Sequence, residues 1–427
     1  MKKRIVTYLR GVLTIALAAA VLTGCGAANS GSAQTASAVV DSAAEDSAPA
    51  DSQDSVADAS SEDGITIGGL WGLTGFIADY EIPGSEGFEL ALEEINAAGG
   101  IDGKQVNYVS YDAQSDVSQA TSLTTKLVEV DGANVIVGLG DPNAAIAAGT
   151  VAQDHGVPSL ATTSTLPYTQ DRVGDTAFLV PYGDNIQAAA VAEYAYNELG
   201  AKTAYVVTDT TDEYTLSLSK FFQSHFIALG GEVFGESTYD DNGYTDFSAS
   251  IQKVKALPES PDVLFFASFT DQGPTIIKQY RDAGLDQPIL SGDGLDSTEI
   301  AEIAGEAANN VYFSTHVDYT EAGDVSKFYE AYNKKYGKEP LNAFAALGYD
   351  AAYLIKYAVE NYANGDYSSE SIRDAIAKVT DFKGLTGTID YSSGNVPNKT
   401  VFICRFNDGK KENLTSLVPE ISADENN

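Results

Sequence analysis

The sequence predicts an α/β protein made of two doubly wound, Rossmann-like lobes joined by a hinge of several strands. Short apolar runs alternate with amphipathic segments from residue 65 onward, and this alternation starts again after residue 199. Strands that are apolar throughout are typical of parallel sheets covered by helices on both faces. Residues 64–427 are also too many for one ordinary core, so we expect two lobes.

The first half of the alternation predicts four strands and three helices. The expected strands are 65–69, 106–111, 135–137 and 157–161. Phe88, Leu92 and Ile95 recur at helical spacing, and Gly99-Gly100 ends that helix. The other expected helices are 117–130 and 144–154.

A helix at 185–199 leads into the second half. Its expected strands are 205–207, 232–234, 263–266, 289–290 and 311–313, and its expected helices are 216–229, 245–256 and 273–283. The helices 325–336 and 342–362 and the strand-like runs 387–391 and 400–406 come after both halves. The chain should therefore cross between the lobes more than once, which makes a hinge. The predicted borders are 64–184 plus 316–395 for lobe 1 and 185–315 plus 396–420 for lobe 2.

The N-terminus has the pattern of a signal peptide followed by a lipidation site. Basic residues precede the apolar run Val12 to Leu22, which is too short to span a bilayer comfortably. Leu22-Thr23-Gly24-Cys25 looks like the lipobox of bacterial lipoproteins. It predicts a signal peptide at 1–24 and Cys25 as the acylated first residue of the mature chain. The alternative is a signal peptide with a chance cysteine.

Residues 25–63 are predicted to form a disordered acidic tether. After Cys25 they are mostly Ser, Ala, Asp, Glu and Gln, with almost no large apolar side chain. Such a segment cannot bury enough surface to offset the entropy of ordering. We expect a linker between the lipid anchor and the globular part.

The composition limits the possible partners. The chain has 25 basic and 61 acidic residues, a formal charge of −36, which argues against nucleic acid and against an anionic membrane surface. Cys404 lies in an apolar run and is expected to be a buried core residue. The histidines, His155, His225 and His316, are scattered without metal-ligand spacing, so no metal is expected.

Motifs for nucleotide binding and catalysis are missing. The sequence contains no G-x-x-x-x-G-K-[ST] loop, no G-x-S-x-G elbow and no H-E-x-x-H. Gly138-Leu139-Gly140 follows a predicted strand but lacks the third glycine of a dinucleotide-binding loop. A carboxylate pair for hydrolysis stays open, but with so many acidic residues any one pair carries little weight. We expect a binding protein without a cofactor rather than an enzyme.

Ligands of open α/β sheets bind beyond the carboxyl ends of the strands. The loops selected by this rule are 70–84, 139–144, 161–168, 209–215, 268–273 and 291–297. They are rich in Thr, Ser, Asp, Gly and aromatic residues. Such loops suit a polar small molecule held by hydroxyls, backbone amides and rings.

Two ordered signatures carry a family resemblance. The opening one runs from Gly72-Leu73-Thr74-Gly75 through Gly87-Phe88-Glu89-Leu90-Ala91 to Gly99-Gly100-Ile101-Asp102-Gly103, and the closing one is Phe382 to Ile389. With them, residues 64–415 resemble the leucine/isoleucine/valine-binding protein family of ABC importers. The resemblance implies the type I periplasmic-binding-protein fold, closure on a small ligand and ABC permease subunits as partners. Hinge closure is the motion known for periplasmic binding proteins.

The resemblance also implies a ligand site. Thr163 and Thr165, with Ser164 between them, fall where the family uses a backbone carbonyl and a Thr hydroxyl with its amide. Asp293 falls where the family sets a carboxylate against the ligand's ammonium. The family's aromatic lining positions are matched by Tyr80, Phe269 and, with one residue of offset, Tyr214. The alternatives are ordinary turns for the Thr-rich stretch and Asp293, and core packing for the rings.

One stretch departs from the family. Its Ser that grips an α-carboxylate is replaced by Asp141-Pro142-Asn143. Pro142 offers no donor, and Asp141 would repel a carboxylate if it faced the cleft. Alternatively, Asp141 is only a helix N-cap. Asn143 or helix amides would then hold the carboxylate, or the ligand is not an α-amino acid.

The function expected from the resemblance is that of an extracytoplasmic, lipid-anchored solute-binding component of a bacterial ABC importer, with a branched-chain or other amino acid as ligand. The family also serves amides, urea and aromatic acids. Rival interpretations are a sensor that feeds a membrane receptor, a surface hydrolase and a scaffold.

Overall fold

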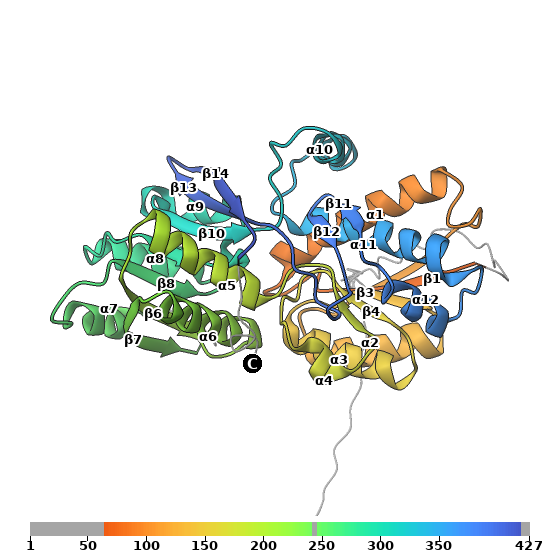
Figure 1. Cartoon of the computed structure of the whole chain (residues 1–427), viewed down its shortest axis with the longest axis horizontal. Coiled ribbons are helices and arrows are strands. Elements are labelled where there is room, and N and C mark those ends of the chain that lie inside the picture. Colours follow the sequence, from red (N-terminus) through yellow and green to blue (C-terminus); the bar gives the residue numbers. More distant parts are fainter. Residues whose placement is uncertain (1–63, 241–245, 420–427) are drawn as a thin grey trace, which may run out of the picture. The chain divides into compact units, whose positions relative to one another are not determined.

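The computed structural model describes residues 64–240 and 246–419. The predicted signal peptide, Cys25 and the tether lie outside these residues. The described residues form two α/β lobes, each with its own sheet (Figure 1). None of the helices in this part of the chain is both long and apolar enough to cross a membrane.

The first lobe has a five-stranded parallel sheet in the order β2-β1-β3-β4-β5. Its strands are β1 (Thr66–Trp71), β2 (Asn107–Asp112), β3 (Val135–Gly138), β4 (Ser159–Ala161) and β5 (Ala177–Leu179). The helices between them are α1 (Ala78–Ala97), α2 (Val117–Glu129), α3 (Pro142–Asp154) and α4 (Thr169–Val173). The later chain adds α10 (Asp324–Tyr336), α11 (Phe344–Ala358) with a π-helical turn η4 (Val359–Ala363), α12 (Ser369–Ile376) and the hairpin β11 (Phe382–Gly384) and β12 (Gly387–Ile389).

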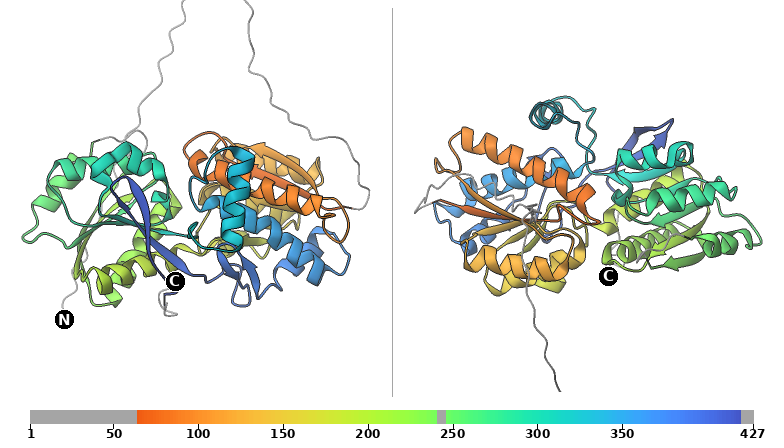
Figure 2. Two further views of the ribbon diagram at one scale, coloured as in Figure 1. Left: turned by 90° about the horizontal axis from the view of Figure 1, so that it is seen from above. Right: turned by 180° about the vertical axis from the view of Figure 1, so that it is seen from behind.

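The helices of the first lobe cover both faces of its sheet (Figure 2). Ile67 and Val137 face α1 and α11 in one apolar cluster. Leu70 and Ile136 face α2 and α3 in another. Because β3 is buried at every position, its uninterrupted apolar sequence is what a doubly covered central strand requires.

The second lobe has a seven-stranded sheet in the order β14-β13-β10-β9-β8-β6-β7. The parallel strands are β6 (Thr203–Asp209), β7 (Glu232–Tyr239), β8 (Val263–Ala267), β9 (Ile289–Ser291) and β10 (Val311–Thr315). Two antiparallel strands, β13 (Val401–Asn407) and β14 (Lys410–Leu417), complete one edge. The helical elements are α5 (Asp184–Glu193), η1 (Tyr194–Glu198), α6 (Glu213–Ala228), α7 (Ser248–Lys255), α8 (Gly273–Asp282), η2 (Asp293–Leu295), α9 (Thr298–Ala304) and η3 (Gly305–Ala308).

The chain passes between the two sheets three times, after β5, after β10 and before β13. The expectation of more than one crossing is therefore confirmed. The residues at which each lobe begins and ends stay a prediction. Cys404, in β13, is a fully buried core residue as expected.

Helices α1 and α11 cross at very close range because glycines lie at the crossing. A Cβ atom at Gly87 would lie 1.8 Å from the Ala345 carbonyl oxygen, and one at Gly348 would lie 1.9 Å from the Gly84 carbonyl oxygen. No other residue type fits there without moving a helix. This crossing joins the first and the last third of the chain.

Candidate ligand-binding site

A pocket with about 290 Å³ of space not filled by protein atoms lies where the strand ends of the two lobes meet. Each of the six loops selected from the sequence contributes to it. Eight of the nine predicted site residues line it, namely Tyr80, Asp141, Thr163, Ser164, Thr165, Tyr214, Phe269 and Asp293. Asn143 does not. Ile77, Pro142, Gly294 and Phe344 line the pocket without having been predicted as site residues.

Aromatic rings from both lobes form the apolar wall. Tyr80 of α1 packs edge-on against Phe344 of α11, with 5.2 Å between ring centroids. It also packs against Phe269 of the second lobe at 6.2 Å, and Phe269 contacts Tyr214 at 5.2 Å. These rings give the pocket an apolar wall to which both lobes contribute.

Polar contacts across the cleft hold the lobes together. The Tyr80 hydroxyl donates to the Gly294 carbonyl at 2.7 Å and accepts from the Thr270 amide at 2.9 Å. The Asn143 side-chain amide donates to the Asp212 carboxylate at 2.8 Å. Since each bond joins one lobe to the other, the structure is a closed form.

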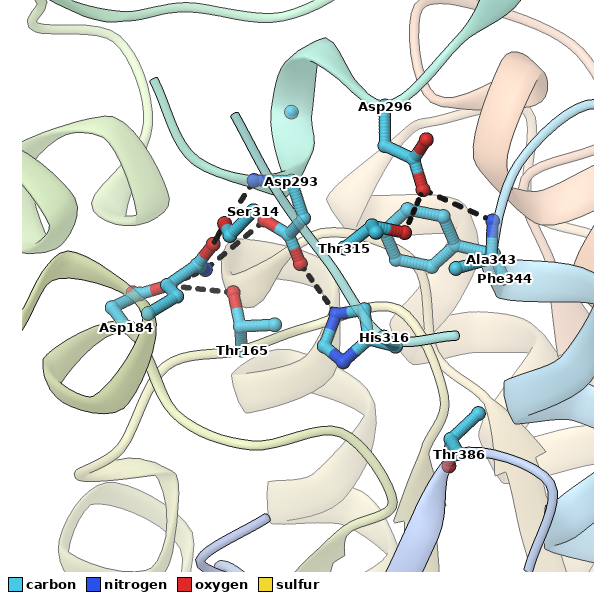
Figure 3. Close-up of polar contacts among 12 residues, drawn as sticks. Thr165, Asp184, Asp293, Asp296, Ser314, Thr315, His316, Ala343, Phe344 and Thr386 are labelled. Carbon is cyan, nitrogen blue, oxygen red and sulfur yellow. Dashed lines mark hydrogen bonds and ion pairs between the residues drawn. The ribbon is translucent and has the colours of Figure 1, made fainter. Parts of the chain in front are cut away.

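Asp293 presents a held carboxylate to the pocket. It lies in η2, directly after β9, and is 2% exposed. One carboxylate oxygen accepts from the Gln187 side-chain amide at 3.0 Å, and the other accepts from His316 Nε2 at 2.7 Å (Figure 3). The Asp293 backbone amide donates to the side-chain oxygen of Gln187, Oε1, at 2.9 Å. These contacts fix the carboxylate group at the second-lobe end of the pocket.

His316 supports Asp293 as a neutral imidazole. Burial lowers the pKa of His316, and the carboxylate only accepts, so Nε2 carries the proton. Nδ1 has no hydrogen-bond partner among the described residues. The ring stacks on Tyr182 with centroids 3.9 Å apart, and both residues lie on segments that cross between the lobes. His316 therefore holds the Asp293 carboxylate without adding a positive charge beside it.

The hydroxyl groups of Thr163 and Thr165 are bonded to buried carboxylates. Thr163 donates to Glu81 of α1, and Thr165 donates to Asp184 of α5 at 2.6 Å. Both threonines stand where the sequence places them, beyond the end of β4. The acidic partners were not predicted.

Glu81 joins three strand ends of the first lobe. Besides Thr163, it accepts from the Gly72 amide and the Gly140 amide, both at 3.2 Å. Glu81 is fully buried, and this burial raises the pKa of its carboxyl to about 7. Its position in the first turns of α1 puts its carboxyl over the ends of β1, β3 and β4.

Asp141 is both an N-cap and a pocket residue. One carboxylate oxygen accepts from the Asn143 amide at 2.8 Å and the Ala144 amide at 3.1 Å, which caps α3. Asp141 is 4% exposed and lines the pocket. Across the cleft, Asp212 caps α6 in the same way, and burial followed by the charge of Asp141 raises the pKa of Asp212 to about 7. The departure seen in the sequence therefore reaches the pocket.

The described part of the chain contains no cluster of three or more His, Cys, Asp or Glu side chains suited to a metal ion. The site residues that were not predicted differ in whether the sequence contained a signal for them. His316 follows β10 directly, so the strand-end rule would have selected it. Glu81 falls inside the selected segment 70–84, although it was not named as a site residue, and Gln187, in the first turn of α5, gives no such signal.

A pocket between two doubly wound lobes defines a solute-binding protein. The chain belongs to the periplasmic binding protein family, whose model matches residues 64–411. The family and the fold expected from the sequence are thus confirmed.

Curated relatives and solved structures agree with this assignment. The chain is 30% identical over 349 residues to Leu/Ile/Val-binding protein homolog 3 of Brucella melitensis, covering 81% of this chain and 92% of that protein. It is similar to the substrate-binding protein LivJ from Streptococcus pneumoniae in complex with isoleucine, with 32% identity, a TM-score of 0.76 and coverage of 83% of this chain and 99% of that chain. The leucine-binding protein LivK from Thermotoga maritima gives 30% identity, a TM-score of 0.77 and the same coverage.

Proposed function

We propose that this protein is the extracytoplasmic solute-binding component of an ABC importer and that it closes on a small polar ligand carrying an ammonium group. The observation that carries the proposal is the Asp293 carboxylate, held by Gln187 and His316 inside an aromatic pocket between two lobes. Branched-chain and other amino acids are the first candidates, because the relatives are named for binding such ligands.

Binding begins on the open form, at the strand ends of the first lobe around Thr163 and Thr165. Closure then adds Tyr214 and Asp293 from the second lobe. A ligand shifts the equilibrium only by as much as it binds the closed form better than the open form. The closed protein docks on the permease subunits, and no covalent bond is made or broken, so the protein is not an enzyme.

Lipid on Cys25 would hold the protein at the outer face of the bacterial cell membrane. At least two acyl chains are needed for stable anchoring, as a lipoprotein N-terminus provides. Replacing Cys25 by alanine is expected to move the protein from the membrane fraction to the soluble fraction. Retention of the Cys25→Ala variant in the membrane would contradict the anchor.

The main test is ligand-linked closure. The purified protein is titrated with amino acids, amides, urea and aromatic acids in a calorimeter, and X-ray scattering follows its radius of gyration. We expect one class to bind stoichiometrically, without turnover, and to reduce the radius. Turnover would favour a hydrolase, and binding without any permease partner would favour a sensor that feeds a membrane receptor.

A second candidate ligand class has a specific observation in its favour. Asp141 lines the pocket with a carboxylate where a ligand's own carboxylate would come to lie. Amides and urea lack that negative charge and offer N–H donors to it. They therefore belong in the first round of titrations.

A further inference from the structure

The groups around the pocket narrow the ligand class further. We propose that the pocket takes a small organic cation, an ammonium compound with an apolar body and no free carboxylate, and that it discriminates against the amino acid of the same shape. This inference rests on the proposed function, because it concerns the ligand of the same site. Four observations carry it.

The first observation is that a side chain of the protein already occupies the strand-end donors of the first lobe. Glu81 accepts from Gly72, Gly140 and Thr163, which follow β1, β3 and β4. Beyond the ends of these adjacent strands is where an open α/β sheet offers donors to an anionic ligand group. Glu81 is fully buried, and all three of its partners belong to its own lobe, so these bonds do not depend on closure of the lobes.

The second observation is that both helix N-termini at the cleft are capped from within. Asp141 takes the first amides of α3, and Asp212 takes the Tyr214 amide of α6. A helix N-terminus attracts an anion only through free amides and its dipole. The capping carboxylates satisfy those amides and oppose a second negative charge.

The third observation concerns the hydroxyl groups beyond the end of β4. The Thr165 hydroxyl donates to Asp184. The Ser164 hydroxyl is 1% exposed, lines the pocket and has no hydrogen-bond partner among the described residues. A neutral hydroxyl such as that of Ser164 can orient an amine or an amide, but it cannot by itself balance a buried carboxylate.

The fourth observation is the charge of the wall. The residues that line the pocket include two carboxylates, Asp141 and Asp293, and no lysine, arginine or histidine. The rings of Tyr80, Tyr214 and Phe269 belong to the same lining, and aromatic rings can attract an ammonium group through their faces. Both charged side chains of the lining therefore favour a cation.

A matched ligand series tests the proposal. Leucine, leucinamide and 3-methylbutylamine share the branched alkyl group and the amine, and they carry a carboxylate, a neutral amide and neither group, respectively. Calorimetry on the full chain should give a Kd for leucine at least about tenfold weaker than that of the best of the other two. X-ray scattering in the same samples reports closure.

The outcomes separate this inference from the proposed function. Leucine binding as tightly as its two analogues, with closure, overturns the inference and leaves the proposed function intact. If none of the three compounds binds or closes the lobes, both the inference and the ammonium-ligand function fall. Preference for the amine or the amide supports both.

A pair of variants tests whether the charge of Asp141 causes the discrimination against leucine. Asp141→Asn removes the charge and keeps an N-capping side chain. In this variant, the ratio of the Kd for leucine to the Kd for the tighter of its two analogues should be several-fold smaller than in the wild type. Asp116→Asn is the matched control, because Asp116 caps α2 in the same lobe, is exposed and does not line this pocket. An Asp141→Asn protein that discriminates as strongly as the wild type would refute the role of this charge.

Discussion

Replacing Asp293 by asparagine should weaken binding of an ammonium ligand strongly while keeping the shape of the pocket. Asp293 is 2% exposed, so its ion pair with the ammonium group of the proposed ligand would be buried in the closed form. An exposed ion pair contributes only about 0.2–1 kcal/mol, whereas removing one partner of a buried, hydrogen-bonded charge pair costs about 2–5 kcal/mol. The Kd should therefore rise by about 30-fold to several thousand-fold.

Calorimetry with the tightest ligand of the matched series measures this change in Kd, and thermal unfolding measures the stability of the variant. The asparagine amide cannot accept from both Gln187 and His316, so stability should also fall, by about 1–3 kcal/mol. Asp324→Asn serves as the control, since Asp324 is 84% exposed and pairs only with Lys327 among the ion pairs of the described residues. A folded Asp293→Asn protein with an affinity within a factor of two of the wild type would refute the ammonium role.

Three further changes test the closed form and its core. Gly87→Ala brings a Cβ to 1.8 Å from the Ala345 carbonyl oxygen and should cost about 1–3 kcal/mol of unfolding free energy; an unchanged denaturant midpoint would contradict this. Tyr80→Phe removes the hydroxyl that donates to Gly294 across the cleft and should weaken ligand binding about tenfold, with a larger radius in X-ray scattering; unaltered closure would show the bond to be dispensable. Burial raises the pKa of Glu81 to about 7 in the folded protein, above its ordinary value of 4.5. The folded state therefore favours the protonated carboxyl. The resulting stabilisation is complete below about pH 4.5 and is lost as the pH rises through 7. Between pH 5 and pH 8 the free energy of unfolding should fall more for the wild type than for Glu81→Gln, by up to about 3 kcal/mol, as measured by thermal unfolding. Equal falls in the two proteins would show that Glu81 does not cause the pH dependence.

Strands and helices with strong apolar patterns could be predicted to within a few residues. The expected strand 263–266 is Val263–Ala267, and the expected helix 325–336 is Asp324–Tyr336. β14 was missed because its sequence, Lys410–Leu417, is mostly polar and pairs at the edge of the sheet. Its register comes from β13, which no local pattern reveals.

The candidate site was predictable in position but not in its internal contacts. The ends of parallel strands meet at one edge of a sheet, so six loops could be selected from strand positions alone. The partners of the threonines depend on how α1 and α5 lie over those ends. Glu81 and Asp184 looked like any other acidic residues in a chain with 61 of them. Only their burial distinguishes them.

The close crossing of α1 and α11 has a consequence for the order of folding. The Asn342 side-chain amide donates to the Asp79 carbonyl at 2.7 Å, a contact between residues 263 positions apart. Phe88 and Leu92 of α1 share a core with Leu354 and Ile355 of α11. A growing chain cannot cover these α1 side chains until more than three quarters of it has been synthesised. Contacts of such long range form slowly, so we expect the first lobe to complete its folding only after α11 has been made, although its sequence begins first.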